Sequence, residues 1–240
     1  MNMQKLTQKT AAREDVYETL RQQIIEFELL PGEFLSENGL AARLNVNRTT
    51  VREALTRLEM DHCVEVFPQR GTQVSRISPE RIRQAVFLRS TLEQNVLEQL
   101  CETGVTPEQF SLLEESLRRQ RSYFAAQEES CLLNEDTRMH RLLYRFCGRE
   151  AAWNAFSSLN CDMMRIRFLK IRTFSYPRAQ LGPVDSWENL LIEHRMMLDA
   201  LRKRDAEALG LLSSAHLSHI ERNAADLRMI YPQYFEADDR

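Results

Sequence analysis

Four residues in the second half of the chain carry side chains that commonly bind metal ions, at spacings that suit helices. Asp136 and His140 lie four positions apart, so both project from one face of a helix. His194 and His216 lie about equally far before and after a helix break near residue 204, so two antiparallel helices would place their imidazoles at one level. One carboxylate and three imidazoles suit a borderline divalent ion, Zn²⁺ first, with Ni²⁺ or Mn²⁺ as alternatives.

Spacing alone leaves other interpretations open. Asp and His four residues apart are common on helices, so the four residues can equally be separate, hydrogen-bonded or surface side chains. A bound ion with open positions can activate water, which makes a metalloenzyme a rival hypothesis. Against it, no second acid or nucleophile accompanies the four residues at a recognisable spacing. A third interpretation keeps the ion and gives it a purely structural role.

The elements that would position these residues are helices. The chain has 240 residues with 7 Gly and 7 Pro, about half the usual share of these turn-formers. From residue 78 onward the pattern is helical, with an irregular stretch at 175–184, and it predicts an antiparallel all-helical bundle. The first predicted helix covers 78–104, the second begins at 106, and the third ends near 148. Three further helices are predicted over 150–174, 185–202 and 205–230.

The first part of the chain has a different organisation. Apolar residues at helical spacing predict a helix over 13–28, and Pro31-Gly32 then ends it. Ser36 and Asn47 are typical caps for two further helices, over 37–44 and 48–61. Strand-like segments at 65–67 and 73–75 predict a small β-hairpin. The predicted fold is mainly α, with an N-terminal winged helix-turn-helix and a C-terminal bundle.

The helix over 48–61 has the distribution of a DNA-recognition helix. Its apolar stripe consists of Val51, Ala54, Leu55 and Leu58. Arginine binds guanine edges through two hydrogen bonds, and threonine hydroxyls reach phosphates, so a polar face near the helix start suits the major groove. Glycine at a hairpin tip lets a backbone approach a minor groove. The predicted DNA-contacting residues are Arg48, Thr49, Thr50, Arg52, Arg70 and Gly71.

The charge of the chain is informative only locally. The net charge of −3 excludes a broadly basic nucleic-acid coat and offers no attraction to membranes. Residues 43–57, however, contain four arginines against Glu53 alone. An ordinary solvated helix face has the same appearance, and the helix-turn-helix with its wing favours DNA over that alternative. We find no signal peptide or membrane span, and the odd, scattered cysteines are typical of reduced thiols in the cytoplasm.

The N-terminal pattern resembles a known family. Residues 13–77, with Leu-Ser-Glu at 35–37 and Asn-Arg-Thr-Thr-Val-Arg-Glu-Ala-Leu at 47–55, are similar to GntR-type transcription regulators. The R-x-x-V-R-E-A-L core is highly specific. One departure is His62, which stands where a glycine commonly ends the recognition helix. The resemblance implies a dimer bound to an inverted-repeat operator in double-stranded DNA.

The C-terminal part resembles the FCD domain of the FadR branch of that family. The similarity covers 80–225 and rests on Arg89-x-x-Leu92-Glu93 and on the motifs around the Asp and three His. It implies that Asp136, His140, His194 and His216 hold a metal beneath a pocket for a small carboxylate. It also makes Arg89 the first candidate for effector binding, because its position matches the family pattern. Arg165 and Arg167, on the predicted helix over 150–174, are weaker candidates, and they can equally be arginines at the surface or at the flank of that helix. The fatty-acyl-CoA-responsive members lack the Asp and His set, which argues against such an effector.

These observations predict a cytoplasmic, homodimeric transcription regulator rather than an enzyme. Its effector would be a small organic or sugar acid, and family membership favours repression relieved by that effector. The predicted organisation is a flexible N-terminus over 1–12, a DNA-binding domain over 13–77, an effector-binding and dimerisation domain over 78–231, and a tail over 232–240.

Overall fold

The computed structural model describes residues 3–174 and 187–237, and the side chains from residue 14 onward. None of the helices in these residues is long and apolar enough to cross a membrane. The described elements are α1 (Met3–Ile25), β1 (Phe34–Leu35), α2 (Glu37–Leu44), α3 (Arg48–Met60), β2 (Val64–Phe67), β3 (Gly71–Val74), α4 (Pro79–Thr103), α5 (Pro107–Ala126), α6 (Glu129–Phe146), α7 (Glu150–Ser157), α8 (Cys161–Phe174), α9 (Trp187–Lys203), α10 (Ala206–Ile230) and the 3-10 turn η1 (Pro232–Tyr234).

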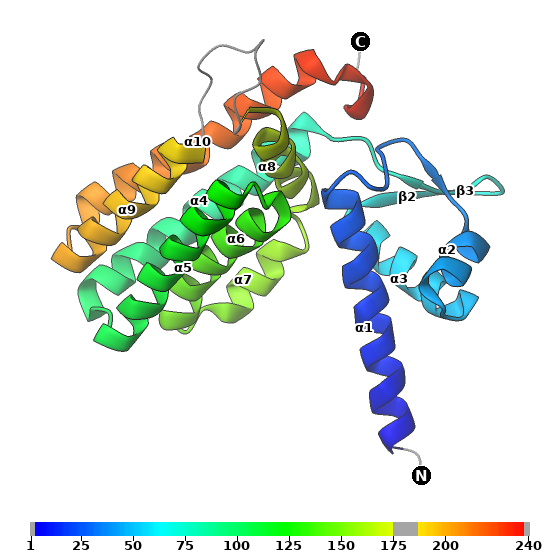
Figure 1. Cartoon of the computed structure of the whole chain (residues 1–240), viewed down its shortest axis with the longest axis horizontal. Helices are drawn as coiled ribbons and strands as arrows, with labels where there is room; N and C mark the ends of the chain where they lie inside the picture. The colour runs from blue at the N-terminus through cyan, green and yellow to red at the C-terminus, as the bar shows by residue number, and fades with distance from the viewer. Residues whose placement is uncertain (1–2, 175–186, 238–240) are drawn as a thin grey trace.

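The first part is a winged helix-turn-helix, as predicted (Figure 1). The predicted caps are present, since Ser36 accepts a hydrogen bond from the amide of Gly39, and Asn47 accepts one from that of Thr50. The wing has one strand more than the predicted hairpin, because β1 pairs with β3 and gives the antiparallel order β1-β3-β2. The predicted apolar stripe of α3 is buried and packs in the same core as Leu20 and Ile24 of α1.

The N-terminal helix is longer than expected. We expected residues 1–12 to be flexible, whereas α1 begins at Met3. Residues 3–12 contain no Gly or Pro and consist largely of good helix formers such as Met, Gln, Lys and Ala, which favours this helix; the flexibility of the segment stays a prediction. At the other end of this part, His62 ends α3 with a φ of 56°. It therefore adopts the left-handed conformation that glycine would favour there.

The C-terminal part is a helical bundle of α4 to α10 (Figure 1). The predicted helix over 150–174 is two helices, α7 and α8, separated at 158–160. A tertiary contact explains the break, because Arg21 of α1 donates to Asn160 Oδ1 at 2.7 Å and to the carbonyl of Ser157 at 3.3 Å. The predicted irregular stretch at 175–184 and the predicted helix start at 185 lie outside the described residues.

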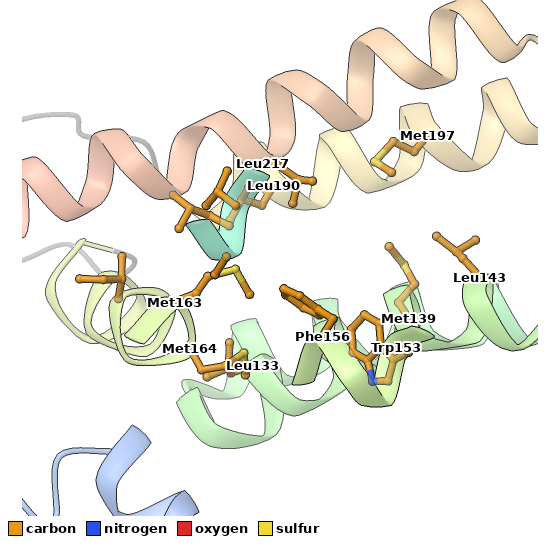
Figure 2. Close-up of a cluster of buried hydrophobic side chains, with 14 of the residues drawn as sticks. Leu133, Met139, Leu143, Trp153, Phe156, Met163, Met164, Leu190, Met197 and Leu217 are labelled. Atoms are coloured by element: carbon orange, nitrogen blue, oxygen red, sulfur yellow. The ribbon is translucent and has the colours of Figure 1, made fainter. Parts of the chain in front are cut away.

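The bundle core is mostly aliphatic, methionine and aromatic side chains. The stripe over 153–169, which contains Trp153, Phe156 and Met163, belongs to this core. In Figure 2, Phe156 lies between the lower helices and the pair of helices that carry Leu190 and Leu217. The stripe therefore stabilises the bundle.

Helix α8 joins the two parts of the molecule. Every residue from Cys161 to Ile171 is buried, including the polar Asp162 and Arg165. Cys161 packs in the core of the DNA-binding part, whereas other residues of α8 pack in the bundle core. The predicted tail also contributes, because Phe235 is buried and pairs with Ile77 in the segment between the two parts.

Candidate metal centre and nucleic-acid interface

The four predicted metal ligands meet inside the bundle. Asp136 and His140 come from α6, His194 from α9 and His216 from α10. Each offers one ligand atom, and these four atoms lie within 4.8 Å of one another. All four side chains are buried. Because α9 and α10 run antiparallel, His194 and His216 face each other at one level, with their Nε2 atoms 3.4 Å apart.

Each imidazole is oriented by an acceptor on its other nitrogen. Carboxylate and amide oxygens only accept hydrogen bonds, so each Nδ1 carries the proton and each Nε2 presents a lone pair. The Nδ1 atoms donate to Glu93 Oε1 from His140, to Gln120 Oε1 from His194 and to Glu193 Oε2 from His216, each at 2.9 Å. This is the arrangement that orients histidines in metal sites.

The inward-facing atoms lack partners of their own. His140 Nε2 and Asp136 Oδ1 are buried without a hydrogen bond, and the lone pairs of His194 and His216 point at one another. Buried acceptors left facing each other are costly unless a cation or donor lies between them. A divalent ion satisfies all four at once, so these residues fit a metal.

Protonation supports the same conclusion. Burial lowers the pKa of all three histidines, and for His194 and His216 the neighbouring imidazoles and arginines lower it further. In His140 the carboxylate of Glu93 partly opposes this effect. The imidazoles are thereby kept in the neutral form that binds metal.

Two buried arginines balance two buried carboxylates around the cluster. Arg167 of α8 pairs with Asp136 Oδ2, and Arg89 Nε donates to Glu93 Oε2 at 3.2 Å. Burial would raise the pKa of Glu93, but His140 and Arg89 lower it well below its usual range. These four charges cancel before any ion is added, so a divalent cation leaves excess positive charge that a bound anion would neutralise.

The two predicted effector-binding residues are in different places. Arg89 lies beside the cluster of Asp136 and the three histidines, and its Nη2 is a buried donor without a partner. Arg165 is not near the cluster. It donates to the carbonyl and Oγ of Ser75, and pairs with Asp162, at the junction with the DNA-binding part. Arg165 therefore holds the two parts together, and its role in effector binding stays a prediction that these contacts do not favour.

Sequence reasoning missed several residues of the site. Glu93 and Glu193 were noted only as parts of family motifs, and Gln120 carries no sequence signal because it is far from the ligands along the chain. Tyr144 is a further case, since its hydroxyl is buried without a partner and its pKa is raised by burial and by Glu93. Arg167 pairs with Asp136, and His219 contacts Glu193 Oε1 at 2.9 Å behind His216.

The predicted DNA-contacting residues of α3 divide into two groups. Arg48 and Arg52 are exposed, with 57% and 60% of their side-chain surface accessible, and Thr49 is also exposed. Thr50 is only 5% exposed, and its hydroxyl lies 3.1 Å from the capping oxygen of Asn47. Its side chain therefore belongs to the helix cap, and its contact with DNA stays a prediction that this burial does not favour.

A single carboxylate lies between the two exposed arginines. Arg48 Nε donates to Glu37 Oε2 at 2.6 Å, and Arg52 Nη2 donates to the same oxygen at 3.0 Å. These hydrogen bonds lower the pKa of Glu37, so it remains ionised. Glu37 thereby fixes both guanidinium groups on the surface of α3 and competes with any anion that binds them.

The predicted wing residues lie at the tip of the hairpin. Arg70 is exposed, and its guanidinium lies 5.5 Å from the ring centroid of Phe34 and 5.8 Å from that of Phe67. Gly71 has a φ of 103° and open space where a Cβ would be. Two aromatic rings therefore support the arginine beside a backbone that a DNA groove can approach closely.

Comparison with known proteins agrees with both halves of this geometry. Residues 12–74 match the bacterial regulatory proteins of the gntR family, and residues 84–219 match the FCD domain. The chain belongs to the GntR family. It is a DNA-binding transcription regulator with an FCD effector-binding domain, and its family and relatives are regulators, not enzymes, so the metalloenzyme hypothesis is set aside.

Relatives of this GntR regulator span nearly its whole length. It is 28% identical to the HTH-type transcriptional repressor RspR of Escherichia coli K12, over 94% of both chains. It is 31% identical to an HTH-type transcriptional regulator in an unstable DNA locus of Streptomyces ambofaciens, over 94% of this chain and 90% of the relative.

Solved structures share the fold. Escherichia coli McbR/YncC superimposes with a TM-score of 0.72 at 20% identity, over 93% of this chain and 98% of that one. A putative GntR regulator from Rhodococcus sp. RHA1 gives a TM-score of 0.66 at 24% identity, over 90% and 98%.

Proposed function

We propose that this GntR regulator is a metal-containing repressor that releases its operator when a small carboxylate binds. The observation that carries the proposal is the convergence of three Nε2 lone pairs and Asp136 Oδ1 on one buried point. FCD domains often bind metal, and the donor set of three imidazoles and one carboxylate favours Zn²⁺, with Ni²⁺ or Mn²⁺ as alternatives.

The effector is a small organic or sugar acid. A divalent ion at the cluster gives the buried site excess positive charge, and a carboxylate restores neutrality while occupying an open position on the ion. The unpartnered Nη2 of Arg89 and hydroxyl of Tyr144 are donors available to the same ligand.

The DNA-bound form is a homodimer on an inverted repeat, in the cytoplasm. One α3 presents Arg48, Thr49 and Arg52 to a single half-site, so a second copy is needed for a site long enough to be specific. Repression is the sign of regulation we propose, because RspR, similar over nearly the whole length, is named a repressor.

The experiment begins with metal analysis of the purified full-length protein. The operator is selected from a random duplex library, and its affinity is measured before and after chelation and with a panel of small carboxylates. We expect one metal ion per chain, two chains per operator by light scattering, and weaker operator binding with one class of carboxylate only while metal is present. The proposal is wrong if the affinity for the operator changes neither on chelation nor with any of the carboxylates.

A matched pair of variants separates a functional from a purely structural metal. His194→Ala removes a ligand, whereas His219→Ala removes an imidazole that contacts Glu193 but is not a ligand. We expect His194→Ala to abolish the response to carboxylate and His219→Ala to retain bound metal. A lower melting temperature in His194→Ala with an unchanged carboxylate response would favour the structural role.

A further inference from the structure

The chain that follows α10 returns to the segment between β3 and α4, the linker between the two domains. The amide of Ile77 in the linker donates to the carbonyl of Tyr234 at 2.9 Å, and the amide of Glu236 donates to the carbonyl of Ile77 at 3.0 Å. These bonds form a parallel bridge between Ile77 and Phe235, whose side chains are both buried. Residues 232–236, the strap, are therefore paired with the linker.

Aromatic side chains extend this contact to both domains. The ring centroid of Tyr234 in the strap lies 5.2 Å from that of Phe27, which follows α1 in the DNA-binding domain. Tyr234 also stacks on Tyr231 at the end of α10, with 5.5 Å between the ring centroids. The Tyr231 hydroxyl lies 3.2 Å from Thr173 Oγ1 of α8. A row of three rings therefore runs from the bundle to the DNA-binding domain, with the strap in its middle.

One arginine at the start of α4 holds the strap, the linker and α8 together. Arg81 Nη1 donates to Glu236 Oε1 of the strap at 3.0 Å, and its Nη2 donates to the carbonyl of Arg76 in the linker at 2.7 Å. Its Nε donates to Asp162 Oδ2 of α8 at 2.7 Å. Arg76 in turn donates to the carbonyl of Gln233 at 2.6 Å. The planar fork of a guanidinium makes these three bonds at once, which the single nitrogen of a lysine cannot reproduce.

Helix α10 connects the strap to the cluster of Asp136 and the three histidines. His216 lies near the middle of α10, and the strap follows the end of this helix (Figure 1). The helix is continuous from His216 to Ile230, a length of about 21 Å at ~1.5 Å per residue. Because a continuous helix moves largely as a rigid element, a displacement of α10 at His216 also displaces the strap.

We propose that the strap is a regulatory contact that holds the DNA-binding domain in one orientation against the bundle and is released by a shift of α10. Release frees the linker at Ile77 and lets α3 change its orientation relative to the bundle, which alters operator affinity. The release step rests on the proposed function, because it requires a ligand that displaces His216. The holding step rests only on the contacts among the strap, the linker and α8.

Trypsin tests the holding step. Arg76 is exposed and is a trypsin site, and the residue after it donates its amide to the strap. Cleavage after Arg76 requires the linker to open, so its rate reports the population of the released form. Full-length Arg81→Lys should be cut there about tenfold faster than wild type, because it loses charge-assisted hydrogen bonds to the strap and the linker. Mass spectrometry identifies the fragment that ends at Arg76.

Two further chains separate the strap from a general loss of stability. Arg83→Lys changes an exposed arginine of the same helix that pairs with Glu80, and it should be cut like wild type. A chain that ends at Tyr231 retains all of α10 but lacks the strap, and it should be cut at least as fast as Arg81→Lys. Circular dichroism checks that each chain is folded. If the chain that ends at Tyr231 is cut after Arg76 no faster than wild type, the proposal is wrong.

Operator binding tests the release step in the same chains, with Zn²⁺ alone and with Zn²⁺ plus each carboxylate of the panel. All chains should keep the wild-type affinity for Zn²⁺, because they retain Asp136 and the three histidines. The ligand that weakens operator binding by wild type and Arg83→Lys should also speed cleavage of both after Arg76. It should leave the operator affinity of the chain that ends at Tyr231 unchanged.

The outcomes distinguish a failure of the strap from a failure of the proposed function. If the chain without the strap responds to the ligand as wild type does, the strap does not transmit the signal and the proposal is wrong. If wild type binds neither Zn²⁺ nor any carboxylate, the proposed function and the release step both fail. The rate of cleavage after Arg76 then decides the holding step alone.

Discussion

Arg167 pairs with one carboxylate oxygen of Asp136 and leaves the other oxygen facing His194 Nε2 at 3.4 Å. The pair joins α8 to α6 through a buried side chain on each helix. The arginine thereby selects which oxygen of Asp136 would bind the proposed metal ion. It neutralises the charge of the other oxygen and keeps the carboxylate from rotating.

Arg167→Lys should weaken metal binding without unfolding the protein. An ammonium group keeps the charge but lacks the planar fork that fixes the carboxylate, and such supporting contacts are worth roughly 10- to 100-fold in metal affinity. Competition with a chromophoric chelator measures the affinity. Arg172→Lys, an exposed position on the same helix, is the control, and equal affinities in the two variants would remove Arg167 from the site.

Glu37→Gln should make DNA binding tighter and less selective. The variant removes the carboxylate that competes with phosphates for Arg48 and Arg52, so affinity for a random duplex should rise severalfold at low salt. The advantage should shrink as salt increases. Glu59→Gln changes the net charge equally on an exposed position of α3, and fluorescence anisotropy compares the two. A similar gain in both variants would attribute the effect to net charge alone.

Arg165→Met should loosen the domain junction. It leaves Ser75 and part of Asp162 buried without their partner, and breaking a buried ion pair costs about 3 kcal/mol in free energy of unfolding. We expect a lower melting temperature and an earlier separate transition for the DNA-binding domain in calorimetry. Arg172→Met, on the same helix but exposed, should melt like wild type. If Arg165 does not stabilise the junction, the Arg165→Met and Arg172→Met variants should melt at the same temperature.

His62→Gly should stabilise the DNA-binding domain by about 1 kcal/mol, because it relieves the left-handed backbone at the end of α3. Asn45 also has a positive φ, of 53°, but asparagine tolerates that conformation. Asn45→Gly should therefore change stability little. Urea unfolding monitors both variants, and destabilisation by His62→Gly would mean that the imidazole itself makes a stabilising contact.

Local sequence patterns predicted the DNA-binding domain well. Val51, Ala54, Leu55 and Leu58 repeat at helical spacing because one face of α3 packs inward, and the caps obey short-range rules. The hydroxyl of Thr50 joins the cap of Asn47, a contact that sequence spacing does not reveal. Strand β1 was missed because its two residues become a strand only by pairing with β3.

The meeting of Asp136 with the three histidines could be predicted from the sequence, whereas the surroundings of this cluster could not. Spacing placed Asp136 with His140, and a family resemblance joined them to the other two histidines. Gln120 and Arg167 approach from helices whose relative rotation no local pattern encodes. Arg165 is a related case, since α8 is buried on every side and its periodicity does not distinguish a pocket-facing arginine from one at the junction.

The burial of α8 also constrains how this chain can diverge. A helix with a solvent-facing side accepts substitutions at every third or fourth position, whereas α8 has almost no such positions between Cys161 and Ile171. Neutral drift should therefore be slow along this helix and should lack the 3.6-residue rhythm of its neighbours. In a saturation mutagenesis screen, α8 would appear as one uninterrupted block of intolerant positions, which marks the segment where natural variants of this regulator carry the highest risk of losing function.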